Sequence, residues 1–206
     1  MAGSATENFF KIRAEKQDHI LNAAFAVFGK QGYRKASMAD IAKEAGTTKG
    51  MITYYFGSKR TLYLHLVETI QSSFMAAAKE RLIVDTTDLF EKLAIAIELQ
   101  ATAIKAYPAL MKFVNSVYRE NDPEVAEHIE TFFVDEMAAF NNMLAENIDF
   151  SKFVQGFDPE LLCKFFAWAL TGFYEEMHES GNPDNIDAGV AEFYKCLDIM
   201  RKTFYK

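Results

Sequence analysis

The stretch from Ser37 to Lys59, SMADIAKEAGTTKGMITYYFGSK, constrains the fold of this chain more than any other. It predicts two short helices separated by a tight turn. Ser37 is a good N-cap, because its hydroxyl oxygen accepts a hydrogen bond from a free amide in the first helical turn. Gly46 stands where the first helix must end, since glycine adopts the left-handed conformation of a helix C-terminus without steric cost. Thr47 or Thr48 can cap the second helix.

The two helices have the character of a helix-turn-helix. Apolar residues repeat at helical spacing in the first of them, namely Met38, Ile41, Ala42 and Ala45. The second begins with small or polar residues, which let a helix N-terminus come close to a DNA groove, and in helix-turn-helix proteins those residues meet the base edges. A plain helical hairpin within a core is the other interpretation, and the spacing alone leaves it open.

Further features extend this pattern at fixed spacing between Ile20 and Glu68. They are Ser37-Met38, Ile41-Ala42, Ala45-Gly46, Lys49-Gly50, Tyr54-Tyr55-Phe56, Ser58-Lys59 and Leu62. Together they resemble the DNA-binding domain of the TetR family of bacterial transcriptional repressors. The resemblance covers about the first third of the chain. The remainder matches that family only in length and helical character.

This resemblance implies an all-α fold with two domains. A helix-turn-helix DNA-binding domain is expected over residues 1–58, with a first helix at about 10–31, a second at 38–45 and a recognition helix at 48–55. An effector-binding and dimerisation domain is expected over residues 59–206. The implied partners are a double-stranded DNA operator, a second copy of the chain and an unknown small molecule, with no cofactor.

Carried over position by position, the resemblance assigns Lys49 and Tyr54 to base edges or the groove. Lysine at a groove can donate to guanine O6 or N7. Thr48 and Gly50 would let the helix N-terminus approach. Thr53 departs from the family, which often has a tyrosine at this position, so a large contact is absent.

Four further residues would contact phosphates, which orient a protein on the duplex without reading its sequence. They are Ser37, Thr47, Tyr55 and Lys59. Packing against the next helix is the alternative for Tyr54 and Tyr55, and one of the two is expected to pack in this way. Gly57 stands where lysine is frequent in the family, so one phosphate contact is missing.

Charge is distributed unevenly along the chain. Residues 1–60 carry ten Lys and Arg against five Asp and Glu, whereas residues 61–206 carry 12 against 24. The net charges of +5 and −12 give the total of −7. A basic first segment on an acidic remainder suits contact with DNA by one end, although it is also compatible with a solvated face.

Other chemistries find little support in the 206 residues. Cys163 and Cys196 lie in apolar helical surroundings and are expected to be core residues rather than a disulfide framework. His128 and His178 lack metal-ligand spacing. A helical enzyme and an interaction module with a vestigial DNA-binding part are the competing function classes, and no phosphate loop or nucleophile elbow supports the first.

Without a signal peptide or apolar span, the chain is expected in the cytoplasm.

The remaining chain predicts helices over 59–84, 89–106, 108–119, 123–146, 159–179 and 186–205, after a loose tail at 1–8. The last two have apolar stripes that fit either the chain's own core or a seam between two copies. The family resemblance favours the dimer seam. Its residues would be Leu162, Phe166, Ala169 and Phe173, with Val190, Phe193, Leu197, Met200 and Phe204.

The middle helices are rich in aromatic and methionine side chains. Such residues usually form a core, but the resemblance implies a pocket for a small, largely apolar effector. The expected lining is Phe90, Ile97, Tyr107, Met111, Phe113, Tyr118, Phe133, Met137, Phe140, Trp168 and Phe173. Glu98, Gln100 and Thr102 interrupt one apolar helix, and one of them could supply a polar group, although such residues more often face water.

Overall fold

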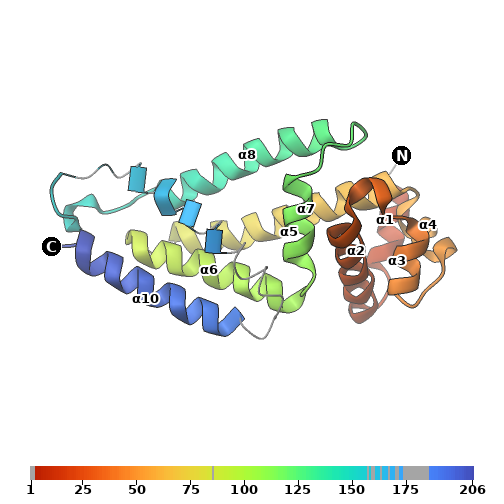
Figure 1. Cartoon of the computed structure of the whole chain (residues 1–206), viewed down its shortest axis with the longest axis horizontal. Helices are drawn as coiled ribbons and strands as arrows, with labels where there is room; N and C mark the ends of the chain where they lie inside the picture. Colours follow the sequence, from red (N-terminus) through yellow and green to blue (C-terminus); the bar gives the residue numbers. More distant parts are fainter. Residues whose placement is uncertain are drawn as a thin grey trace. The chain divides into compact units, whose positions relative to one another are not determined.

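The computed structural model describes residues 3–84, 86–156, 158, 161–162, 164–166, 168–169, 172–173 and 186–206, and its named elements are all helices (Figure 1). They are α1 (Gly3–Phe10), α2 (Ala14–Lys35), α3 (Met38–Glu44), α4 (Lys49–Phe56), α5 (Lys59–Val84), α6 (Leu89–Ala106), α7 (Leu110–Tyr118), α8 (Ala126–Ala145), the 3-10 helix η1 (Phe150–Lys152) and α10 (Ile186–Phe204). The described residues between 161 and 173 are also helical. None of the described helices has the length and apolar character needed to cross a membrane.

The chain forms two compact units. Unit 1 comprises Met1–Ser72 and Ala106–Phe133, and unit 2 comprises Ser73–Lys105 and Val134–Lys206. Unit 1 thus extends beyond residue 58, the expected end of the DNA-binding domain, and includes α7. The reason is a close crossing of α2 and α7, where a Cβ on Gly29 would lie 2.8 Å from the backbone carbon of Lys112. Only glycine permits this approach.

The N-terminal segment differs from the expected loose tail, because residues from Gly3 onward form α1. This helix lacks a strong apolar repeat of its own. It is held instead by Phe9, which is fully buried and packs its ring against Phe56 of α4 with the centroids 4.8 Å apart. Tertiary contact therefore stabilises a helix that local sequence does not indicate.

Aromatic rings fill the core of unit 1. Phe28 of α2 and Tyr63 of α5 meet edge to face with centroids 4.9 Å apart, and Tyr63 makes similar contacts with Tyr33 and Phe113. Edge-to-face pairs of this kind add to the stabilisation that burial provides. Because the four rings come from α2, α5 and α7, they join these helices into one core.

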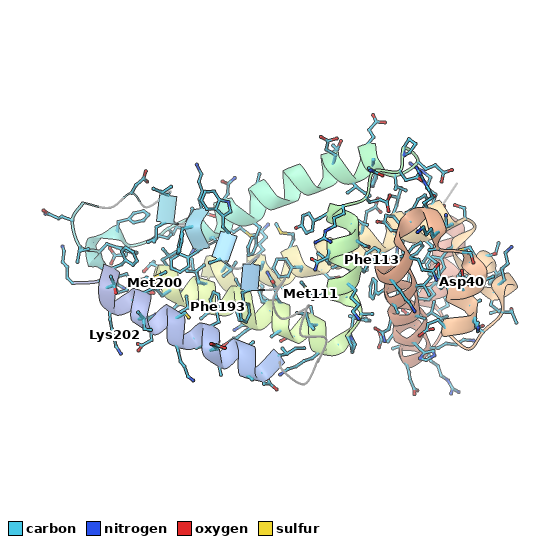
Figure 2. All side chains as sticks on the ribbon, viewed as in Figure 1. Asp40, Met111, Phe113, Phe193, Met200 and Lys202 are labelled. Carbon is cyan, nitrogen blue, oxygen red and sulfur yellow. The ribbon has the colours of Figure 1, made fainter. Side chains whose placement is uncertain are left out.

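Unit 2 has two apolar clusters. The first contains Phe90 and Ile97 of α6, with Phe193 and Leu197 of α10, and Figure 2 shows Phe193 and Met200 on α10. The second joins residues of α5, α6 and α8, including Ala78, Leu82 and Phe140.

Lys92 is fully buried in unit 2. Its ammonium donates to the carbonyl oxygens of Met143 at 3.1 Å and Glu146 at 2.5 Å. A buried charge needs such partners, and a cation suits the C-terminal carbonyls of a helix. Lys92 therefore ties α6 to the end of α8.

The buried carboxylate of Asp88 connects three parts of unit 2. Asp88 caps α6, since its Oδ1 accepts from the amides of Phe90 and Glu91 at 3.0 and 3.2 Å. The same oxygen accepts from Arg201 at 3.2 Å, and Oδ2 lies 3.4 Å from the Lys152 ammonium. Asp88 thus connects the start of α6 with η1 and with the end of α10.

We expect Asp88→Asn to lower the free energy of unfolding at pH 7 by about 1–3 kcal/mol, because charge-assisted hydrogen bonds are lost in a buried position. Burial raises the pKa of Asp88, but the Glu91 amide, Tyr205, Arg201 and Lys152 outweigh burial and hold the pKa below its ordinary value. The stabilisation from ionised Asp88 is therefore present above the unfolded pKa, about 3.9, and is lost as the pH falls through the lower folded-state pKa.

Urea unfolding from pH 7 down to pH 3 measures this difference. Asp187→Asn is the matched control, because the Asp187 side chain is 80% exposed and its pair with Lys105 lies at the surface, where an ion pair contributes little. Equal effects of the two substitutions at pH 7 would contradict the assigned role of Asp88.

Candidate DNA interface

The turn between α3 and α4 is set by local hydrogen bonds. The Ser37 hydroxyl oxygen accepts from the Asp40 amide at 3.1 Å and so caps α3. At the other end of α3, the Thr47 amide donates to the Ala42 carbonyl at 2.9 Å, while Gly46 has a φ of 56°. This is the left-handed helix end for which glycine is suited. The helix-turn-helix geometry follows from the predicted cap and stop residues.

The recognition helix α4 is capped at both ends. The Thr48 hydroxyl oxygen accepts from the Met51 amide at 3.2 Å. Gly57 has a φ of 72° and its amide donates to the Thr53 carbonyl at 2.7 Å. Ser58 then caps α5 by accepting from the Thr61 amide at 3.0 Å. The helix α4 is therefore about two turns long, with a defined start and a defined end.

One face of α4 is exposed and the other is buried. The exposed residues are Lys49, Gly50, Thr53 and Tyr54, and Thr48 is exposed just before them. Ile52, Tyr55 and Phe56 are buried. The structure therefore brings together, on one free face, the four residues predicted to meet the groove, namely Thr48, Lys49, Gly50 and Tyr54. A face of small, hydroxyl, cationic and phenolic groups offers hydrogen-bond donors to base edges and phosphates.

The two adjacent tyrosines take different roles. Tyr54 is 58% exposed, whereas Tyr55 is 3% exposed and its ring lies edge to face with Phe9. Tyr55 is thus the one of the pair that packs, and its phosphate contact stays a prediction. Ser37 and Thr47, the other predicted phosphate contacts on this side, are half-buried.

Lys59, also predicted at a phosphate, has protein partners. Its ammonium donates to the carbonyl oxygens of Tyr33 at 2.9 Å and Arg34 at 3.3 Å. It also lies 4.3 Å from the centroid of the Tyr33 ring, within the range of a cation–π contact. Lys59 therefore fastens the start of α5 to the end of α2. Sequence offered no signal for these contacts, which join residues more than 20 positions apart.

The turn between α7 and α8 carries Glu120, Asp122 and Glu124 and holds the end of α2. It is called the acidic turn below. Gly32 has a φ of 70°, which redirects the chain so that the Tyr33 amide donates to Glu120 at 2.8 Å. The Tyr33 hydroxyl donates to Glu124 at 2.5 Å. Burial, followed by this bond to Glu124, raises the Tyr33 pKa above its ordinary value. Tyr33 is thus bound at both its backbone and its ring.

Two basic side chains complete this contact. Arg34 donates to Asp122 at 3.1 Å, and Arg60 donates to the Glu124 carbonyl at 2.7 Å. A hydrogen bond from the Glu124 amide, and then Arg34, hold the pKa of Asp122 below its usual range. The acidic turn therefore engages both helices that flank the helix-turn-helix.

The residues predicted to line an effector pocket fall in several places. Phe90 and Ile97 belong to the first cluster of unit 2, Phe173 packs against it, and Phe140 belongs to the second cluster. Trp168 is 67% exposed. The side chains of Phe133 and Met137 lie outside the described part of the chain.

Four more of these residues belong to unit 1. Phe113 is buried among the aromatic rings of its core (Figure 2), Met111 is half-buried and Tyr118 is exposed. Tyr107 donates to Asp18 at 2.7 Å, and burial together with this bond raises its pKa to about 12.

Glu98 lies at the surface of unit 2 and binds neighbouring side chains there. It accepts from Tyr194 at 2.6 Å and from Arg81 at 2.9 Å. These two bonds, with that from Tyr194 the larger influence, lower its pKa. Glu98 thus follows the water-facing alternative rather than the inward one.

The stripes predicted as a dimer seam face the chain's own core. Leu162, Phe166, Phe193 and Leu197 are buried in the first cluster of unit 2, and Phe173, Val190, Met200 and Phe204 pack against it. Ala169 is half-buried. The structure therefore favours the core alternative for these positions. Cys196 is exposed, unlike the expected core residue, and Cys163 lies outside the described residues.

The helical segment that contains Leu162 and Phe166 also carries a second set of apolar residues, which is exposed. Leu161, Phe165 and Trp168 are between 47% and 67% exposed, and they recur at a spacing of four and three. This spacing puts them on one helix face. Their exposure could not be read from sequence, because both stripes of this segment are apolar.

Comparison with known proteins bears on the same region. Residues 20–66 match the family described as bacterial regulatory proteins, tetR family. The transcriptional repressor NicS of Pseudomonas putida is 37% identical over 115 residues, which cover 53% of this chain and 52% of NicS. The regulator QacR of Staphylococcus aureus is 28% identical over 175 residues, covering 82% of this chain and 90% of QacR.

The fold has a solved counterpart in a TetR family transcriptional regulator from Chloroflexus aurantiacus. The two superpose with a TM-score of 0.69 over 98% of each chain, at 20% sequence identity. The match to NicS, by contrast, spans only about half of that relative's length. The helix-turn-helix is thus common to these proteins, and the similarity of fold extends through the chain.

We expect Lys59→Met to lower the free energy of unfolding by about 1–2 kcal/mol, because two carbonyl oxygens lose a charged donor. The slope of log operator affinity against log salt should stay unchanged. Lys49→Met is the matched control, since Lys49 is exposed on α4. It should leave stability within about 0.5 kcal/mol. Urea unfolding and DNA titration at several salt concentrations measure both quantities, and a salt slope reduced by about one for Lys59→Met would restore the phosphate role.

Proposed function

We propose that this chain, which belongs to the TetR family of bacterial transcriptional regulators, is a dimeric repressor of a palindromic operator. A small, largely apolar effector releases it from DNA. The observation that carries this proposal is the free face of α4, where Lys49, Gly50, Thr53 and Tyr54 are exposed together between two glycine-terminated helix ends.

Lys49 and Tyr54 are the proposed base-reading residues. Thr48 and Gly50 are small enough to let the start of α4 approach the groove, and Ser37 and Thr47 lie at or just before the starts of α3 and α4, where phosphates bind. The net charge of +5 over residues 1–60 attracts this end of the chain to DNA. The net charge of −12 over the remainder discourages other orientations.

Dimerisation is proposed because a palindrome presents two half-sites about one helical turn apart, roughly 34–36 Å, related by a two-fold axis. The exposed face of Leu161, Phe165 and Trp168 supports self-association, since large neighbouring apolar side chains on a soluble chain are typical of interfaces. This face replaces the buried stripe as the proposed contact between copies.

The effector is proposed to bind among the aromatic side chains of unit 2. Its chemistry is largely apolar because the two clusters of unit 2 are made of phenylalanine, leucine, isoleucine, alanine and methionine. An effector releases DNA only if it binds the DNA-incompetent state more tightly than the competent one.

Selection from a random-sequence duplex pool should enrich a palindrome bound by a dimer. Lys49→Ala and Tyr54→Ala should each weaken binding to that palindrome by about ten- to a hundredfold, as expected when a base contact is lost. Lys195→Ala is the control, since Lys195 is an exposed lysine of α10, and should bind normally. Fluorescence anisotropy measures the affinities. Failure of effector-free protein to enrich any sequence would remove the repressor proposal in favour of the interaction module.

Trp168→Glu should convert the dimer to a monomer, because it places a charge within the proposed apolar contact. Phe150→Glu is the matched control, since Phe150 is also an exposed aromatic residue of unit 2. Sedimentation velocity distinguishes the two states. A dimer of unchanged stability for Trp168→Glu would exclude this face as the interface.

Titration of the operator complex with candidate apolar molecules tests induction. A bound effector should raise the operator Kd several-fold, which corresponds to a coupling of about 1–3 kcal/mol. Binding of such molecules without any change in operator affinity would refute induction and leave DNA binding intact.

A further inference from the structure

The N-terminal helix α1 packs directly behind the recognition helix. Phe9 is fully buried, and its ring lies 4.8 Å from that of Phe56 and 5.8 Å from that of Tyr55, centroid to centroid. Both partners belong to the buried face of α4. Figure 1 shows α1 beside α4 within unit 1. Phe9 therefore contacts two of the three buried side chains of α4.

Contacts with two other helices fasten α1 in place. The Phe10 ring lies edge to face with the His65 ring of α5, 5.8 Å away, and His65 in turn lies 5.7 Å from Phe56. Burial lowers the pKa of His65 and so favours its neutral form in this apolar site. The Gln17 side-chain amide donates to the Phe10 carbonyl, at the end of α1, at 3.3 Å and to the Ile12 carbonyl, just beyond it, at 2.8 Å. The helix is thus anchored to α2 and α5 as well.

The recognition helix depends on such support because it is only eight residues long. An isolated helix of this length is unstable in water, so its position is determined by packing of its buried face. To read bases, its exposed face must hold hydrogen-bonding groups within about half an ångström of their productive positions. A ring that fills the space behind α4 therefore controls where Lys49 and Tyr54 lie.

We propose that α1 is a positioning element for sequence recognition, in which Phe9, seated behind Tyr55 and Phe56, fixes the orientation of the base-reading face of α4. The inference rests on the proposed function, since it concerns how α4 reads DNA. It also goes beyond that function, because α1 ends ten residues before the segment 20–66 that matches the family.

The test compares specific with non-specific DNA binding in Phe9→Ala. Base contacts require an aligned helix, whereas phosphate contacts provide most non-specific affinity and tolerate small rotations. The variant should therefore lose about tenfold in affinity for the selected operator, while its affinity for a scrambled duplex changes less than twofold. Phe150→Ala is the matched control, being the same substitution at an exposed site in unit 2, and should retain the parental ratio.

Two further measurements separate positioning from general destabilisation. Stoichiometric titration gives the active fraction, so a loss of folded protein does not count as a loss of affinity. Amide NMR shifts of Lys49, Gly50 and Tyr54 should move in Phe9→Ala and stay unchanged in Phe150→Ala. A purely structural role would lower both DNA affinities together, through the active fraction, and would leave the ratio of specific to non-specific affinity unchanged.

Phe9→Leu keeps the site apolar and gives a folded variant if Phe9→Ala is too unstable. Its ratio of specific to non-specific affinity should fall between those of the parent and Phe9→Ala, because the ring contacts are lost while burial is kept. A parental ratio in folded Phe9→Leu or Phe9→Ala overturns the proposal. Absence of operator preference in the parent protein would instead overturn the proposed function, so the two failures are distinguishable.

Discussion

The helix-turn-helix depends on how the end of α2 is held. Gly32 takes a positive φ that places the Tyr33 amide against Glu120 and the Tyr33 ring against those of Tyr63 and Phe28. A residue with a Cβ would be strained in that conformation. Since α3 starts three residues beyond Lys35, the direction in which Tyr33 leaves α2 decides where the whole pair of short helices lies.

Charged groups in unit 1 divide between two tasks. Lys59 binds the end of α2, and Arg34 and Arg60 bind the acidic turn. These three cations are therefore less available to DNA phosphates. Lys49 is exposed on the free face of α4. A count of basic residues therefore overstates the charge offered to DNA, because ion pairs and carbonyl contacts within the unit already engage several of these cations.

Unit 2 shows how an amphipathic repeat can be read in two ways. The stripe of Phe193, Leu197 and Met200 has the three-and-four spacing of a coiled-coil seam, yet it packs on the chain's own α6 and its neighbours. Any helix buried on one side has this spacing, whichever chain supplies the other side. On the preceding helical segment, Leu162 and Phe166 are buried while Phe165 and Trp168 are exposed. A helix that is apolar on two faces can serve a core and an interface at once.

The sequence by itself determined the local elements around the recognition helix. Ser37, Gly46 and Thr48 act within three to five residues of their partners, and the sequence placed α3 and α4 within a residue of their observed ends. Tertiary structure alone decided that Tyr55 packs while Tyr54 stays exposed, that Lys59 binds the end of α2, and that residues from Gly3 form a helix behind α4. The physical reason is range: a cap or glycine turn depends on neighbours along the chain, whereas burial and aromatic contact depend on which distant helix lies opposite.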